Sequence, residues 1–82
     1  MLTNKLGRVL RHMDRECVAY IENSPDTPLC ARTLADYWLR NQVRDSARRM
    51  LLLYLSHIKR RDEQAERALQ TLDAGPPPSN NQ

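Results

Sequence analysis

The apolar residues at the start of the chain recur at steps of three and four positions. This spacing is typical of one face of an amphipathic helix, and it predicts a first helix over about residues 2–22. The segment 23–28 contains two prolines among polar turn-forming residues, so the helix is expected to end there and the chain to reverse. The apolar stripe consists of Leu2, Leu6, Val9, Leu10, Met13, Cys17 and Ile21.

A second helix is predicted over about residues 28–40. Pro28 suits the first helical position, where its missing N–H has no intrahelical acceptor, and Thr27 is expected to cap the helix. The only tryptophan, Trp38, is expected to fill the core between the second and third helices. The stripe through Trp38 would next meet polar side chains at Asn41 and beyond. We therefore favour a break near Asn41 over a continuous bent helix, although no proline or glycine enforces it.

The third predicted helix spans about residues 43–73 and has the most regular pattern in the chain. Its apolar seam follows alternating steps of four and three, as in a heptad repeat, with one charged position. At about 1.5 Å per residue this helix would be about 46 Å long, against about 31 Å for the first, so it would extend beyond its neighbours. The seam consists of Ala47, Leu51, Tyr54, Ile58, Arg61, Ala65, Ala68 and Leu72.

The run from Met50 to Leu55 places apolar side chains on every side of this helix, because six residues at about 100° each exceed a full turn. Two neighbouring helices would leave part of the run uncovered. We therefore expect a homodimer, or a partner protein whose groove takes the same helix. The residues expected at this interface are Leu51, Tyr54, Leu55, Ile58, Ala65 and Leu72.

Length and composition fit a single small all-α domain of three helices. The chain has 82 residues, of which 40% are hydrophobic but only 5% aromatic, so its core is expected to be mainly aliphatic. We expect one helical domain over residues 1–73. A disordered tail is expected over residues 74–82, where Gly75 and three prolines prevent a helix from continuing.

The net charge of +3 is unevenly distributed along the chain. Residues 1–61 contain twelve basic and six acidic side chains, whereas residues 62–82 contain one arginine and four carboxylates. Eleven of the thirteen basic residues are arginine, whose planar guanidinium suits bidentate contacts to phosphate. The net charge alone is too small to establish a polyanionic partner.

A degenerate helix-turn-helix is the alternative interpretation, with its turn near Asn41 and its recognition helix starting near Arg44. The match is poor, because Leu39 stands where the turn usually has glycine and Asp45 near where the recognition helix needs an apolar residue. The candidate nucleic-acid contacts are Arg8, Arg11, Arg15, Arg44, Arg48 and Arg49.

No pattern in the sequence indicates catalysis, a cofactor or a metal site. The two cysteines lack a metal-binding spacing and are expected to be reduced core thiols. The carboxylate pairs, Asp14 with Glu16 and Glu63 with Glu66, are interpreted as solvated helix faces. No apolar run reaches the ~20 residues of a membrane span. Basic residues also interrupt the apolar residues at the start of the chain, so no signal sequence is expected there. A cytoplasmic location is therefore expected.

Together these features favour a small non-enzymatic regulatory or adaptor protein with no small-molecule substrate. It is expected to act through helix-mediated protein binding, as a homodimer or with another protein. DNA binding by a transcriptional regulator remains the alternative.

Overall fold

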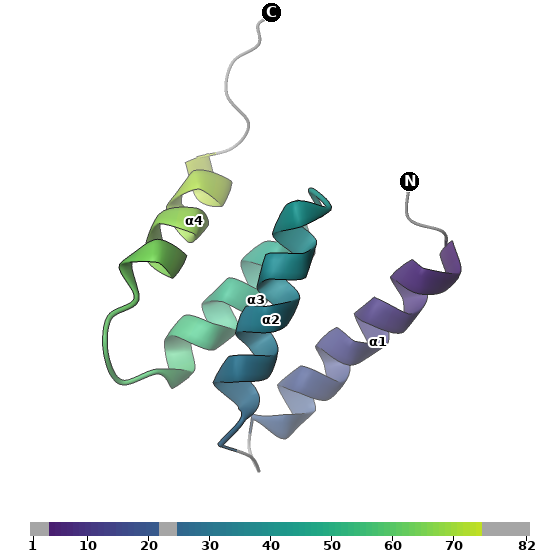
Figure 1. Ribbon diagram of the computed structural model, residues 1–82, viewed down its shortest axis with the longest axis horizontal. Helices are drawn as coiled ribbons and strands as arrows, with labels where there is room; N and C mark the ends of the chain where they lie inside the picture. Colours follow the sequence, from purple (N-terminus) through teal and green to yellow (C-terminus); the bar gives the residue numbers. More distant parts are fainter. Residues whose placement is uncertain (1–3, 22–24, 75–82) are drawn as a thin grey trace, which may run out of the picture.

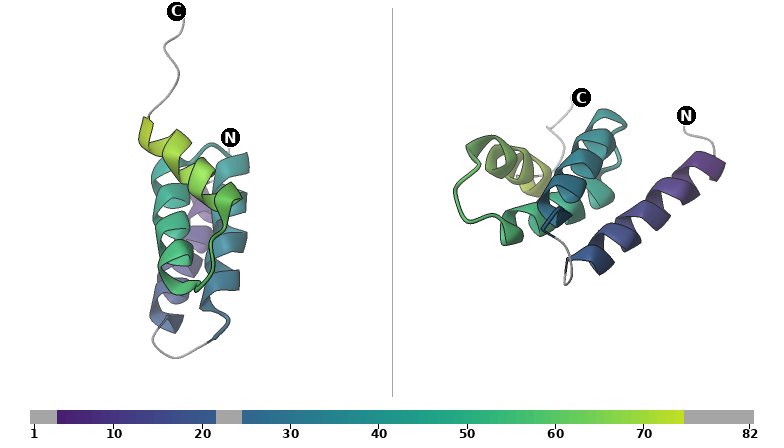
Figure 2. Two further views of the ribbon diagram at one scale, coloured as in Figure 1. Left: turned by 90° about the vertical axis from the view of Figure 1, so that its left-hand side faces the viewer. Right: turned by 60° about the horizontal axis from the view of Figure 1, so that its bottom comes forward.

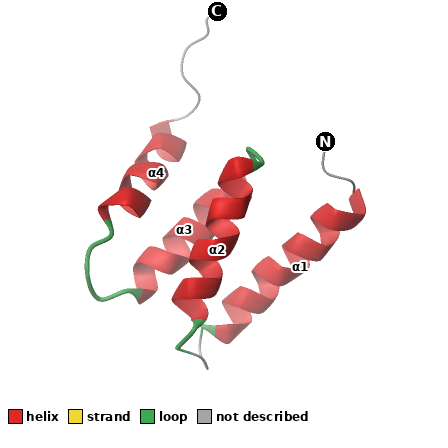
Figure 3. Cartoon of the chain, viewed as in Figure 1, coloured by secondary structure: helices red, strands yellow, loops and turns green. Residues whose placement is uncertain are grey.

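A computed structural model describes residues 4–21 and 25–74, which form four helices and no strand (Figures 1 and 3). The all-α prediction is therefore confirmed. The helices are α1 (Asn4–Tyr20), α2 (Thr27–Arg40), α3 (Arg44–His57) and α4 (Glu63–Ala74). Leu2, the first residue of the predicted stripe, and almost all of the predicted tail lie outside the described residues.

The long third helix predicted over residues 43–73 is wrong, because the chain breaks it into α3 and α4. The segment between them ends at Asp62, which caps α4. The backbone N–H of Ala65 donates to Asp62 Oδ1 (3.1 Å), and the N–H of Glu66 donates to the Asp62 carbonyl (3.0 Å). Glu63 and Glu66 add negative charge to the first turn, which favours a helix N-terminus at this point.

The helix α4 folds back along α3, so the heptad seam packs against itself within one chain (Figure 1). Leu51 and Ala65, one from each half of the seam, are both fully buried. At the closed end of this hairpin the Tyr54 hydroxyl donates to Asp62 Oδ2 (2.6 Å). At the open end Arg44 donates to the carbonyl of Leu72 (2.7 Å).

The fourth helix also explains how the all-round apolar run of α3 is covered. Met50 and Leu51 are fully buried, the three residues from Leu53 to Leu55 are half-buried, and Leu52 is 41% exposed. Most of the surface for which the sequence pattern predicts a second chain is covered by α2 and by α4 of the same chain. The packing of this run therefore no longer requires a dimer.

The predicted break between the second and third helices is confirmed, since α2 ends at Arg40 and α3 begins at Arg44. Gln42 has a φ of 60°, a left-handed conformation that reverses the chain. The N–H of Val43 then donates back to the Trp38 carbonyl (2.9 Å). At the other end of α2 the predicted cap is wrong by one residue: Asp26 holds the N-cap position and Thr27 is a buried first helical residue.

Trp38 is 1% exposed, which confirms its predicted place in the core. Its indole contacts the Tyr37 ring edge to face, with ring centroids 5.5 Å apart. It also reaches the first helix, because its Nε1–H donates to Asp14 Oδ1 (2.9 Å). Trp38 therefore joins α1 to the helices that follow it.

Candidate functional site

Asp14 is the polar anchor of α1, contrary to its interpretation as part of a solvated face. The residue is 4% exposed and accepts hydrogen bonds from the Trp38 indole (2.9 Å) and from Arg49 Nη2 (3.5 Å). Burial raises the pKa of its carboxyl, and these two donors partly oppose that rise. The sequence contains a signal for this burial, because position 14 lies at helical spacing from both Leu10 and Cys17.

Cys17 is the second buried contact of α1 with α2. Its thiol lies 3.9 Å from the carbonyl of Thr27, and the side chain is fully buried. Burial, followed by the neighbouring Cys30 thiol, raises the pKa of Cys17 to about 12. At neutral pH Cys17 is therefore a protonated thiol, which suits a core position and not a nucleophile.

The other apolar residues of α1 divide into a buried and an exposed set. Leu10 and Cys17 are buried, but Val9 is 51% exposed, Met13 42% and Tyr20 57%. Positions 9, 13 and 20 recur at helical spacing and share one face. We call these three residues the α1 apolar stripe. Figure 2 shows that α1 diverges from α2, α3 and α4 toward its N-terminal end, where Val9 and Met13 precede Tyr20 in the chain.

A row of basic side chains runs beside the α1 apolar stripe. Lys5, Arg8, His12 and Arg15 follow steps of three and four and are all exposed. Within this row His12 lies 3.9 Å from Glu16, the one exposed carboxylate among the described residues of α1. The exposed part of α1 is therefore an apolar stripe with a basic flank.

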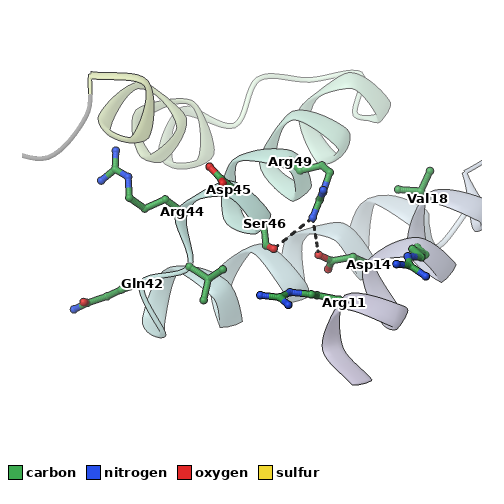
Figure 4. A pocket seen from close by; sticks show the side chains of 10 residues that line it. Arg11, Asp14, Val18, Gln42, Arg44, Asp45, Ser46 and Arg49 are labelled. Atoms are coloured by element: carbon green, nitrogen blue, oxygen red, sulfur yellow. Dashed lines mark hydrogen bonds and ion pairs between the residues drawn. The ribbon is translucent and has the colours of Figure 1, made fainter. Parts of the chain in front are cut away.

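A groove of about 660 Å³ separates α1 from the turn before α3 and from the first turns of α3 (Figure 4). Four arginines line it, two from each side. Asp14 and Ser46, both bonded to Arg49, also line it (Figure 4). We call this the arginine groove. Its lining residues are Arg11, Asp14, Arg15, Val18, Gln42, Val43, Arg44, Asp45, Ser46 and Arg49.

The structure therefore brings together four of the six arginines that the sequence suggested as nucleic-acid contacts: Arg11, Arg15, Arg44 and Arg49. Arg8 is exposed on α1 outside the groove. Arg48 pairs with Asp73 of α4, and Arg44 donates to the Leu72 carbonyl. The C-terminal end of α4 thus occupies part of the face that a recognition helix would present.

The arrangement of α2 and α3 also differs from a helix-turn-helix. The two helices of that motif cross at about 90–120°. Figure 2 shows α2 and α3 side by side along their lengths, as an antiparallel pair. The position that needs a left-handed conformation is Gln42, not Leu39.

The predicted interface residues lie in the α3–α4 hairpin and its connection. Leu51 and Ala65 are fully buried inside the chain, and the other four are half-buried. Tyr54 and Ile58 line a hollow of about 430 Å³ where the chain turns from α3 into α4. The half-buried residues are Tyr54, Leu55, Ile58 and Leu72.

Within residues 4–21 and 25–74, no group of three or more histidine, cysteine or carboxylate side chains is arranged to hold a metal ion. No helix in the same part of the chain has the length and apolar character needed to cross a membrane. No family model matches the chain, and the comparisons with curated proteins and with solved structures gave no match.

Proposed function

We propose that this protein is a small non-enzymatic adaptor or regulator that binds an amphipathic helix of a partner protein along α1. The observation behind the proposal is the α1 apolar stripe. Val9, Met13 and Tyr20 leave 42–57% of their surface exposed on one helix face. Apolar residues aligned in this way are typical of helix-mediated recognition.

The burial of the predicted interface residues favours α1 as the binding surface over the third predicted helix. Leu51 and Ala65 lie in the chain's own core, where a partner has no access without opening the α3–α4 hairpin. The α1 stripe needs no such opening. The helix α1 that carries it lies on the opposite side of α2 and α3 from α4 (Figure 1).

The charge beside the stripe favours a partner helix with acidic residues over a second copy of this chain. Lys5, Arg8, His12 and Arg15 form the flank, and two α1 helices paired antiparallel along the stripe would bring these basic rows together. Like charges across a helix pair are destabilising, whereas glutamates on a partner would be attracted. The partner is therefore expected to present leucine or isoleucine at helical spacing, flanked by carboxylates.

The experiment compares two labelled helical peptides of about 20 residues, long enough to match α1. Both have the same leucine and isoleucine seam, but one has glutamate flanks and the other has lysine flanks. Fluorescence anisotropy should show tighter binding of the glutamate peptide. The double variant Val9→Ser/Tyr20→Ser should weaken that binding about tenfold or more, because each lost apolar contact contributes about 1–3 kcal/mol.

Leu52 supplies the matched control, since it is 41% exposed but lies on α3 away from the stripe. Leu52→Ser should leave peptide binding unchanged. Equal binding of the two peptides, or equal losses in the stripe and control variants, would contradict the proposal. So would a dimer in sedimentation equilibrium that Val9→Ser abolishes, because the stripe would then belong to a second copy.

A further inference from the structure

The arginine groove has basic side chains on both of its walls. Arg11 and Arg15 come from α1. Arg44 and Arg49 come from α3, and Figure 4 labels both together with Arg11. Among the described residues neither Arg11 nor Arg15 forms an ion pair, and both are exposed. Arg49 forms an ion pair with Asp14, and Arg44 extends toward α4, where it donates to the Leu72 carbonyl.

The first residues of α3 also line the groove. The helix α3 has Val43 at its N-cap, with no side-chain hydrogen bond to its first amides. The next three residues, from Arg44 to Ser46, line the groove. Uncapped N–H groups at a helix start favour an anion, and the guanidinium groups nearby favour phosphate oxygens over a single carboxylate.

Two carboxylates oppose this positive charge, and their effects differ. Asp14 is buried at the base and already accepts hydrogen bonds from Trp38 and Arg49. Asp45 is exposed in the first turn of α3. Arg49 is paired with Asp14 and the Arg44 guanidinium extends toward α4, so the positive charge of the lining comes mainly from Arg11 and Arg15, of which Arg11 also attracts the Asp14 carboxylate.

The form of the groove discriminates between anions. A duplex presents its phosphates on a convex surface, which is best met by a ridge or a helix entering a groove of the DNA. Here Arg11, Arg15 and Arg49 line a hollow of about 660 Å³ between two elements, which suits a ligand that enters the protein. We propose that the arginine groove binds a compact anion with two or more linked phosphate groups, held by Arg11, Arg15 and the α3 N-terminus.

Isothermal titration calorimetry with inorganic tripolyphosphate tests this site, with a short random DNA duplex as the second titrant. Tripolyphosphate should bind, and Arg11→Gln or Arg15→Gln should weaken it about tenfold, the effect of one charge-assisted hydrogen bond. Arg8→Gln is the matched control because Arg8 lies on the same helix, one turn away and outside the groove. It should change the affinity less than about twofold.

A second readout locates the ligand. In an amide NMR spectrum, tripolyphosphate should shift the resonances of Arg44, Asp45 and Ser46 and leave those of α4 from Glu66 to Gln70 in place. Equal weakening by Arg8→Gln and Arg11→Gln would overturn the proposal, because net charge would then explain the binding. No binding of tripolyphosphate, or tighter binding of the duplex with no shift at the α3 N-terminus, would also overturn it.

Discussion

The two ends of this molecule, the α3–α4 hairpin and the helix α1, bury their apolar residues to different extents. At one end α3 and α4 close into a hairpin whose seam is internal, with Leu51 and Ala65 fully buried. At the other end α1 buries Leu10 and Cys17 against α2, while Val9 and Tyr20 stay more than half exposed. The hairpin therefore covers its apolar seam within the chain, whereas part of the apolar surface of α1 stays exposed.

The polar contacts of the two regions differ in the same way. The hairpin is tied at the surface, by Tyr54 with Asp62, Arg61 with Glu66 and Arg44 with the Leu72 carbonyl. The helix α1 depends on a buried contact, between Asp14 and Trp38. A surface ion pair adds little to stability, whereas a buried donor that loses its acceptor is costly. Loss of the buried polar contact beneath α1 is therefore expected to cost more stability than loss of any one surface polar contact of the hairpin.

The largest effect is expected from Leu51→Ala, which cuts into the core shared by the hairpin and α2. Removing this fully buried side chain should lower the free energy of unfolding by about 2–5 kcal/mol. Chemical denaturation followed by circular dichroism measures the loss. Its neighbour Leu52, which is 41% exposed, is the control, and Leu52→Ala should cost less than about 0.5 kcal/mol. Similar losses for both variants would show that the hairpin does not cover the seam.

A smaller but local effect is expected from Asp14→Ala, which leaves the buried indole N–H of Trp38 without its acceptor. The cost should be about 1–3 kcal/mol. Hydrogen exchange should accelerate in α1 and change little in α2 and α3, because only α1 is released.

Two further variants separate this contact from a general effect of charge. Asp14→Asn keeps an acceptor of the same size and should restore most of the protection of α1. Glu16→Ala removes an exposed carboxylate of the same helix and should change nothing. Uniform acceleration over all four helices in Asp14→Ala would contradict a separate role for α1.

The smallest effect concerns pH. Burial raises the folded-state pKa of Asp14, so its contribution to stability is complete below the ordinary pKa and is lost as pH rises through the folded value. Hydrogen bonds from Tyr54 and Arg61 lower the folded pKa values of Asp62 and Glu66, so their contributions are lost as pH falls through those values. The two regions therefore oppose each other on acidification.

Thermal melts of wild type and Asp14→Asn between pH 7 and pH 3 test this opposition. The variant lacks the contribution that grows in acid, so its melting temperature should fall further than that of wild type. A parallel fall in both proteins would show that Asp14 does not titrate differently in the folded state.

Much of the fold can be predicted from local patterns of the sequence. The stripe of three- and four-residue steps, the proline-rich turn and the loss of the stripe at Asn41 predicted α1, α2 and the break before α3. The heptad seam was misleading, because the same spacing fits one long helix or two halves folded together. The signal that distinguishes these two possibilities is Asp62 with Glu63 and Glu66 in the following turn. It indicates a new helix start although the apolar spacing continues.

The candidate sites depend on contacts that periodicity does not specify. The spacing of the carboxylates groups Asp14 with its neighbour Glu16, whereas its helical position between the buried residues Leu10 and Cys17 places it in the core. The arginine groove requires α1 to lie beside the start of α3, and residues 11 and 49 are far apart in sequence. The exposure of Val9 and Met13 follows from the angle at which α1 leaves α2, which sequence spacing does not define (Figure 2).

The hydrogen bond between Trp38 and Asp14 also gives the molecule its own optical probe. Trp38 is the only tryptophan, so the whole indole fluorescence of the protein comes from the point where α1 meets the core. An emission maximum at short wavelength reports an indole shielded from water, and release of α1 would shift it to the red. Release of α1 from the core can therefore be followed at micromolar concentration without attaching a dye.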